Sequence, residues 1–195
     1  MKHILSLILI GFSTTLMGQH EELAQKCSAF VADHDSLYEK KYLNISNPPI
    51  GDIDDTDYEF AERFMLESRD RVKSNIDNNI YAKYYVNVYG YADEYDRDWA
   101  LKHWFSNFIE GESIRPGRDK RSYDYAHPTI IIINNKDVAI LHYECQLYDR
   151  DSFQNWREKM LSYFGDVNSI VIEVQCDGPL KWTKNPPDPR DRRWR

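Results

Sequence analysis

His142 and Glu144 are the residues of this chain whose types and spacing most resemble a catalytic pair. They stand two apart in an alternating stretch, residues 137–145, that predicts a β-strand, so both side chains leave one face of that strand. An imidazole and a carboxylate so placed could share a proton or a metal ion. With Tyr85 or His127 assisting, they would form the centre of a small extracytoplasmic hydrolase or metal-dependent enzyme. A solvent-facing pair without chemistry is the other interpretation, because no third metal ligand is recognisable.

A face rich in tyrosine is predicted on a second strand, residues 80–90. Alternation separates an apolar set of side chains from a mixed aromatic and polar set, which comprises Tyr81, Lys83, Tyr85, Asn87 and Tyr89. Aromatic rings supply contact area at low entropic cost, and tyrosine hydroxyls remain available for hydrogen bonds. We therefore expect Tyr85 and Tyr89 to be at least partly accessible, and this face to bind a small polar ligand or a partner protein. Two other interpretations stay open: cross-strand pairs exposed to water, or a face covered by N-terminal helices or by a second copy of the chain.

Residues 110–127 predict a long polar loop with a cluster of basic residues. Arg118 and Arg121 are the candidate binding residues there, since long loops are often functional. Acidic residues in the same loop balance the basic ones, which favours a solvated loop over an anion site.

Several common kinds of chemistry have no motif in this chain. It contains no G-x-S-x-G elbow, no phosphate-binding G-x-x-x-x-G-K, no H-E-x-x-H and no C-x-x-C. The aspartates before residue 58 lack the glycine and the glutamate of a calcium loop. The 32 acidic residues outnumber the 25 basic ones, giving a formal net charge of −7 that disfavours nucleic acid as a partner. We expect no cofactor, and we assign no metal site.

The first eighteen residues predict a cleaved secretory signal. Lys2 precedes the apolar run Ile4–Phe12, and a small residue stands at the Gly18–Gln19 junction, where we expect cleavage. The apolar run is about half the length of a membrane-spanning helix, and no later stretch is long and apolar enough. We therefore expect a secreted or periplasmic protein without a membrane span.

Two helices are predicted in the acidic region that follows, residues 19–79. Apolar residues recur at helical spacing over residues 20–42. A second helix, residues 57–76, is predicted because Thr56 and Glu59 match a capping box and apolar residues follow at helical spacing. We expect this helical pair to pack on the core.

The main body, residues 80–180, alternates as strand, helix, strand, strand, helix, strand. The predicted elements are 80–90, 96–109, 129–133, 137–145, 152–164 and 170–176. This βαββαβ order resembles the ferredoxin-like fold. The expected fold class is therefore α+β, with a ferredoxin-like sheet preceded by two N-terminal helices. Many unrelated functions share this element order, so the resemblance implies no function. Residues 181–195, rich in proline and arginine, predict a mobile tail.

Three cysteines, Cys27, Cys145 and Cys176, follow the predicted signal. An extracytoplasmic compartment permits two of them to pair. In a ferredoxin-like sheet of spatial order 4-1-3-2, the strands ending at Cys145 and Cys176 are antiparallel and separated by the first strand, so these cysteines cannot meet. If the helix of residues 152–164 is instead a simple right-handed crossover between neighbouring parallel strands, both cysteines finish at the same edge and could pair. We expect the first arrangement, and hence no bond between Cys145 and Cys176.

These features together favour an exported, non-enzymatic binding or interaction protein. The tyrosine-bearing face and the loop of residues 110–127 would contact its partner. The enzyme centred on His142 and Glu144 is the alternative.

Overall fold

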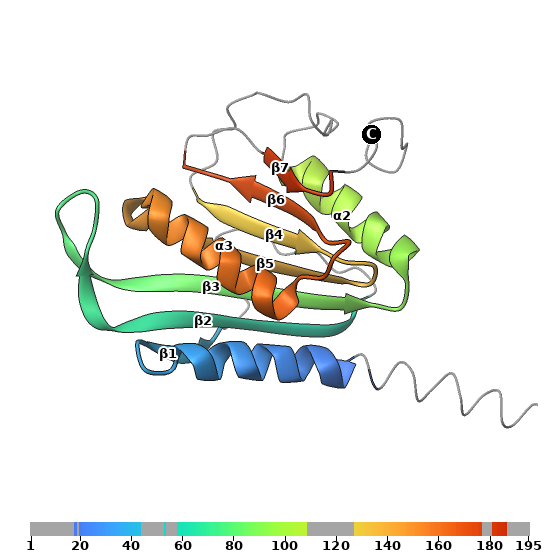
Figure 1. Cartoon of the computed structure of the whole chain (residues 1–195), viewed down its shortest axis with the longest axis horizontal. Coiled ribbons are helices and arrows are strands. Elements are labelled where there is room, and N and C mark those ends of the chain that lie inside the picture. The colour runs from blue at the N-terminus through green and yellow to red at the C-terminus, as the bar shows by residue number, and fades with distance from the viewer. Residues whose placement is uncertain are drawn as a thin grey trace, which may run out of the picture.

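The described part of the chain is built around an antiparallel β-sheet (Figure 1). The computed structural model describes residues 18, 20–43, 53, 58–108, 127–176 and 181–186. Within these residues, seven strands lie in the order β1-β2-β3-β5-β4-β6-β7. The strands are β1 (Tyr38–Tyr42), β2 (Tyr58–Lys73), β3 (Asn79–Tyr91), β4 (Thr129–Ile133), β5 (Asp137–Tyr143), β6 (Ile170–Val174) and β7 (Lys181–Lys184). The longest hairpin, β2–β3, extends beyond the other strands at the left of Figure 1.

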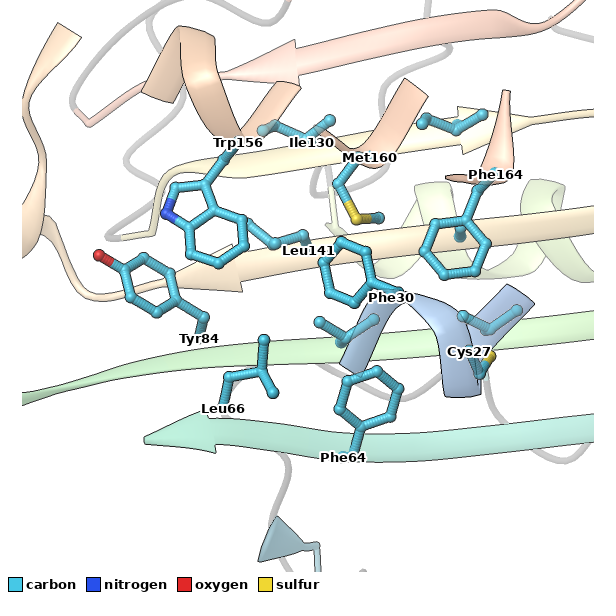
Figure 2. Packing of buried hydrophobic residues seen from close by; sticks show 14 of the residues in the cluster. Cys27, Phe30, Phe64, Leu66, Tyr84, Ile130, Leu141, Trp156, Met160 and Phe164 are labelled. Atoms are coloured by element: carbon cyan, nitrogen blue, oxygen red, sulfur yellow. The ribbon is translucent and has the colours of Figure 1, made fainter. Parts of the chain in front are cut away.

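Helices cover both faces of the sheet. The N-terminal helix, residues 20–34, and α3 (Arg150–Phe164) lie on one face, and α2 (Glu94–Phe108) lies on the other. The short helix η1 (Cys145–Leu147) follows β5. Figure 2 shows the first of the two cores, in which Phe30 of the N-terminal helix lies among side chains of α3 and the sheet: Phe64, Leu66, Tyr84, Ile130, Leu141, Trp156, Met160 and Phe164.

The second core lies between α2 and the opposite face of the sheet. Ala100, Leu101 and Trp104 of α2 pack on fully buried strand residues, among them Tyr89, Tyr91, Ile131, Ile133, Val138, Ile140, Ile172 and Val174. All five residues of β4 are buried because each face of that strand meets a core. The unbroken run of isoleucines in β4 is typical of a strand covered on both sides.

The ferredoxin-like fold class is contradicted by the position of β6. The predicted elements of the main body are present, but β6 pairs with β4 at the far side of the sheet, instead of with β3. Both crossovers therefore run in the same direction, from β3 past β5 to β4 and from β5 past β4 to β6. Because β3 and β5 are antiparallel, connections of one hand place α2 and α3 on opposite faces. A ferredoxin-like sheet would have both helices on one face.

The prediction of a second N-terminal helix over residues 57–76 is also wrong, since residues 58–73 form β2. Phe60 and Phe64 stand four apart, which fits a helix, but an even spacing also fits one face of a strand. The segment forms a strand because it pairs with a strand on each side: Phe64 lies opposite Tyr42 of β1 and Val86 of β3. Thr56 lies outside the described residues.

The first predicted helix ends earlier than expected. It stops at residue 34, and residues Tyr38–Tyr42 form β1 instead of extending the helix. At the other end of the chain, the first residues of the predicted tail, Lys181–Lys184, form β7 and pair with β6.

The prediction that Cys145 and Cys176 do not pair is wrong. The two cysteines form a disulfide with a Cα–Cα distance of 5.6 Å. Since β5 and β6 both run antiparallel to β4, they are parallel to each other. Their C-terminal ends, where the two cysteines follow, therefore lie at the same end of the strands. Cys27 is a free, fully buried cysteine of the first core, and burial raises the pKa of its thiol.

Among the described residues, we find no helix that combines the length and the apolarity needed to cross a membrane. Of the predicted signal segment, residues 1–18, the structure describes Gly18 alone.

Candidate functional site

The predicted tyrosine-bearing face exists, but most of it is buried. Tyr85 lies directly opposite His142, and Tyr89 opposite Val138, so these side chains share the face that α2 covers. Tyr89, Asn87 and His142 are 0%, 4% and 1% exposed, respectively. The expected accessibility of Tyr89 is therefore wrong, because α2 packs over this part of the face. Lys83 and Tyr85, nearer the start of β3, are only half-buried.

His142 is a neutral, buried imidazole beside Tyr85. The two rings are stacked, with centroids 5.0 Å apart and planes 10° from parallel. Burial, together with nearby His127, lowers the pKa of His142 to about 3. Neither ring nitrogen has a hydrogen-bond partner among the residues that the structure describes, and the same holds for Oδ1 of buried Asn87. Such atoms destabilise a fold by about 1–3 kcal/mol each when they stay unpaired.

The structure does not join His142 to Glu144 by a hydrogen bond. Glu144 lies just beyond β5 and accepts a hydrogen bond from Gln146, while His142 is buried. His127 Nδ1 lies 3.2 Å from the carbonyl oxygen of Tyr143. Within the described part of the chain, we find no group of three histidine, cysteine or acidic residues that could hold a metal ion. The enzymatic alternative therefore stays a prediction.

A polar cleft of about 390 Å³ opens at the accessible end of this same face. The end of β2, the beginning of β3 and the segment after β5 form its walls. The cleft is lined by Glu67, Arg71, Asn79, Ile80, Tyr81, Lys83, Glu144, Gln146 and Leu147. It thus contains two of the predicted binding residues, Lys83 and Glu144. Arg118 and Arg121 lie outside the described residues.

A bulge in β2, between Glu67 and Arg71, brings Arg71 into the cleft. Glu67 lies opposite Lys83, and Arg71 opposite Tyr81, so β2 has three residues where β3 has only Ala82. The hydroxyl of Ser68 stabilises this irregularity, because it accepts a hydrogen bond from the Ala82 amide at 2.7 Å and donates one to the Asp70 carbonyl at 2.8 Å. Directly opposed residues share a face, so both pairs point towards the cleft.

The wall formed by residues 144–147 is held from two sides. The tip of the β2–β3 hairpin binds it through Asn75, whose backbone amide donates to the Gln146 carbonyl at 2.8 Å. The side-chain amide of Asn75 donates to the Cys145 carbonyl at 2.9 Å. On the other side, the disulfide ties Cys145 to Cys176 at the end of β6. Gln146 and Leu147 therefore line the cleft from an anchored segment.

Charges of both signs are close together in the cleft. Glu67 forms ion pairs with Lys41 of β1 and, at 3.7 Å, with Lys83. The hydrogen bond from Lys41 is the main reason that the pKa of Glu67 is lowered. The guanidinium of Arg71 lies 5.5 Å from the centre of the Tyr81 ring. Two carboxylates, Glu67 and Glu144, thus balance Arg71 and Lys83.

Tyr85 connects the cleft with the buried histidine. Its ring stacks on His142, and its hydroxyl has a raised pKa because of burial and because the Glu144 and Glu67 carboxylates are near. The accessible remainder of the predicted tyrosine face is therefore continuous with the cleft.

Sequence reasoning missed Glu67, Arg71, Asn79 and Gln146. Glu67 and Arg71 fell within the helix predicted over residues 57–76, so they could not be aligned with Lys83. The signal that could have placed Glu67 is the spacing of apolar Phe64 and Leu66, two residues apart, which is typical of one face of a strand and leaves Glu67 on the other face.

Comparison of the chain with protein-family models, with curated proteins and with solved structures gave no match.

Proposed function

We propose that this protein is an exported, non-enzymatic binding protein that holds a small polar ligand in the cleft of β2, β3 and the 144–147 segment. One observation carries the proposal: charged and amide side chains from three separate segments converge on one cleft. Its volume of about 390 Å³ lies within the range of small-molecule sites, about 300–1,000 Å³. Tyr81, 46% exposed, and Tyr85 supply aromatic surface beside the polar groups.

The anchored wall supports binding. A site whose lining residues are already held in place loses less conformational entropy when a ligand arrives. Here the disulfide and Asn75 hold the segment that carries Glu144 and Gln146.

Export is the second part of the proposal. The disulfide between Cys145 and Cys176 supports it, because such bonds persist in oxidising compartments and are rare in the cytosol. The charged start, the apolar run Ile4–Phe12 and the Gly18–Gln19 junction favour the same compartment.

A ligand screen with a charge-matched variant tests the binding proposal. We would measure the shift in Tm caused by amino acids, short peptides, saccharides and carboxylic acids. Lys83→Met/Glu144→Gln removes one charge of each sign from the cleft. Glu22→Gln/Lys26→Met removes an ion pair of the N-terminal helix and is the matched control. At least one compound should raise Tm in the wild type and the control, but not in the cleft variant. A panel without any such compound would overturn the proposal.

A further inference from the structure

We infer that the cleft selects a zwitterionic ligand, a dipeptide or tripeptide with free termini, whose carboxylate binds Arg71 and whose ammonium group binds Glu144. This inference rests on the proposed function and adds the class of ligand. It follows from which charged groups of the cleft already have a partner of opposite charge.

Glu67 and Lys83 are already paired. Glu67 receives a hydrogen bond from Lys41, and Lys83 lies 3.7 Å from the same carboxylate. Only 18% of the Glu67 side chain is exposed, against 44% of that of Lys83. A ligand charge at Glu67 would have to compete with two lysines.

Arg71 and Glu144 remain available. Within the residues that the structure describes, Arg71 forms no ion pair, and its exposed guanidinium lies along the Tyr81 ring. The planar fork of N–H donors in arginine suits a carboxylate, which can accept two parallel hydrogen bonds. Glu144 accepts a hydrogen bond from neutral Gln146 but has no cationic partner among the described residues. The cleft thus presents one anion-binding and one cation-binding group.

The spacing of these two groups favours a peptide over a single amino acid. Arg71 belongs to β2 and Glu144 follows β5, and β3 lies between those strands. The backbones of strands two positions apart are separated by about 10 Å, so the backbones of Arg71 and Glu144 are at least about that far apart. An extended chain covers about 3.3–3.6 Å per residue, so two or three residues separate the terminal charges by about 7–10 Å.

Other ligand classes match less well. A neutral saccharide would leave both Arg71 and Glu144 without an opposite charge. A polyanion would meet the carboxylates of Glu67 and Glu144, and a divalent cation would meet Arg71 and Lys83. Like charges brought together in a partly enclosed site disfavour binding.

Calorimetric titration with four probes tests the inference. The probes are trialanine, N-acetyl-trialanine, trialanine amide and maltose. We expect trialanine to bind the wild type at least tenfold more tightly than either blocked peptide. Arg71→Met should remove the preference for trialanine over its amide, while Glu144→Gln should remove the preference for trialanine over its acetylated form. Arg150→Met and Glu158→Gln, exposed on α3, are the matched controls and should retain both preferences.

The outcomes separate the two proposals. If maltose or a blocked peptide binds as well as trialanine and Lys83→Met/Glu144→Gln abolishes that binding, the cleft is a binding site but not one for zwitterions. If none of the peptides binds, the inference is also overturned. The proposed function fails only if no compound of the wider screen depends on the cleft.

Discussion

Buried His142 makes the protein sensitive to acid. Its pKa is about 3 in the folded state, because burial and His127 oppose protonation, against about 6.5 in an unfolded chain. Protonation therefore favours the unfolded state. The stability contributed by neutral His142 is fully present above about pH 6.5 and is lost progressively as the pH falls towards 3.

Replacing His142 should make stability less dependent on pH. Between pH 7 and pH 4.5, we expect His142→Phe to lose about 2–3 kcal/mol less than the wild type, since a pKa difference of one unit is worth about 1.4 kcal/mol. Phenylalanine keeps an aromatic ring beside Tyr85. Urea unfolding at both pH values measures the difference, with the partly exposed His20→Gln as the control. An identical pH dependence in wild type and His142→Phe would contradict the burial of this residue.

Tyr85 and Tyr89 have different surroundings although they are neighbours on one strand face. Tyr89 is fully buried beneath α2, whereas Tyr85 is half-buried next to the cleft. Tyr89→Ser should therefore lower the free energy of unfolding by about 3–5 kcal/mol, a loss typical of truncating a large core aromatic. Tyr85→Ser should lower it much less, and Tyr42→Ser, at a site 80% exposed, hardly at all. Equal losses for Tyr85→Ser and Tyr89→Ser in urea unfolding would show that α2 does not cover the face selectively.

At the scale of the elements, the disulfide links the end of β6 to the wall of the cleft. It closes a loop between residues 31 positions apart, which includes α3. Cross-linking a loop of this length restricts the unfolded chain and stabilises the fold by about 3–4 kcal/mol.

Removing the disulfide should therefore weaken both the fold and the cleft. We expect Cys145→Ala/Cys176→Ala to lose about 3–4 kcal/mol in urea unfolding. Hydrogen exchange should accelerate more at residues 144–147 than in the N-terminal helix, because the segment then loses its covalent anchor and keeps the hydrogen bonds to Asn75 and the packing of Leu147 on the first core. Cys27→Ala, which leaves the disulfide intact, is the control for exchange at the cleft wall. Unchanged exchange at residues 144–147 would mean that the disulfide does not position this wall.

At the scale of the whole molecule, local patterns predicted the elements of the main body but not their arrangement. Alternation in residues 80–90 predicted β3. Helical spacing of apolar residues around Trp104 and Trp156 predicted α2 and α3. No local pattern shows that β6 pairs with β4 instead of β3. This pairing is the reason that α2 and α3 lie on opposite faces of the sheet. The isoleucine run of β4 was the available sign that both faces are covered.

The candidate site was predictable only in part for the same reason. Lys83 and Glu144 follow from strand alternation, which local sequence encodes. Arg71 reaches the cleft through a bulge and a long-range pairing with Tyr81, neither of which spacing alone can show. Tyr89 has the same pattern position as Tyr85, and only the packing of α2 distinguishes them.

The central claim is that the cleft of β2, β3 and the 144–147 segment is the ligand site. Backbone amide shifts measured by NMR during titration with trialanine test it most directly. We predict that the largest changes occur at Glu67, Arg71, Lys83, Glu144 and Gln146, with little change in α3. Changes centred outside the cleft would contradict the claim, whereas no change at millimolar peptide would overturn only the inference that the ligand is a zwitterion.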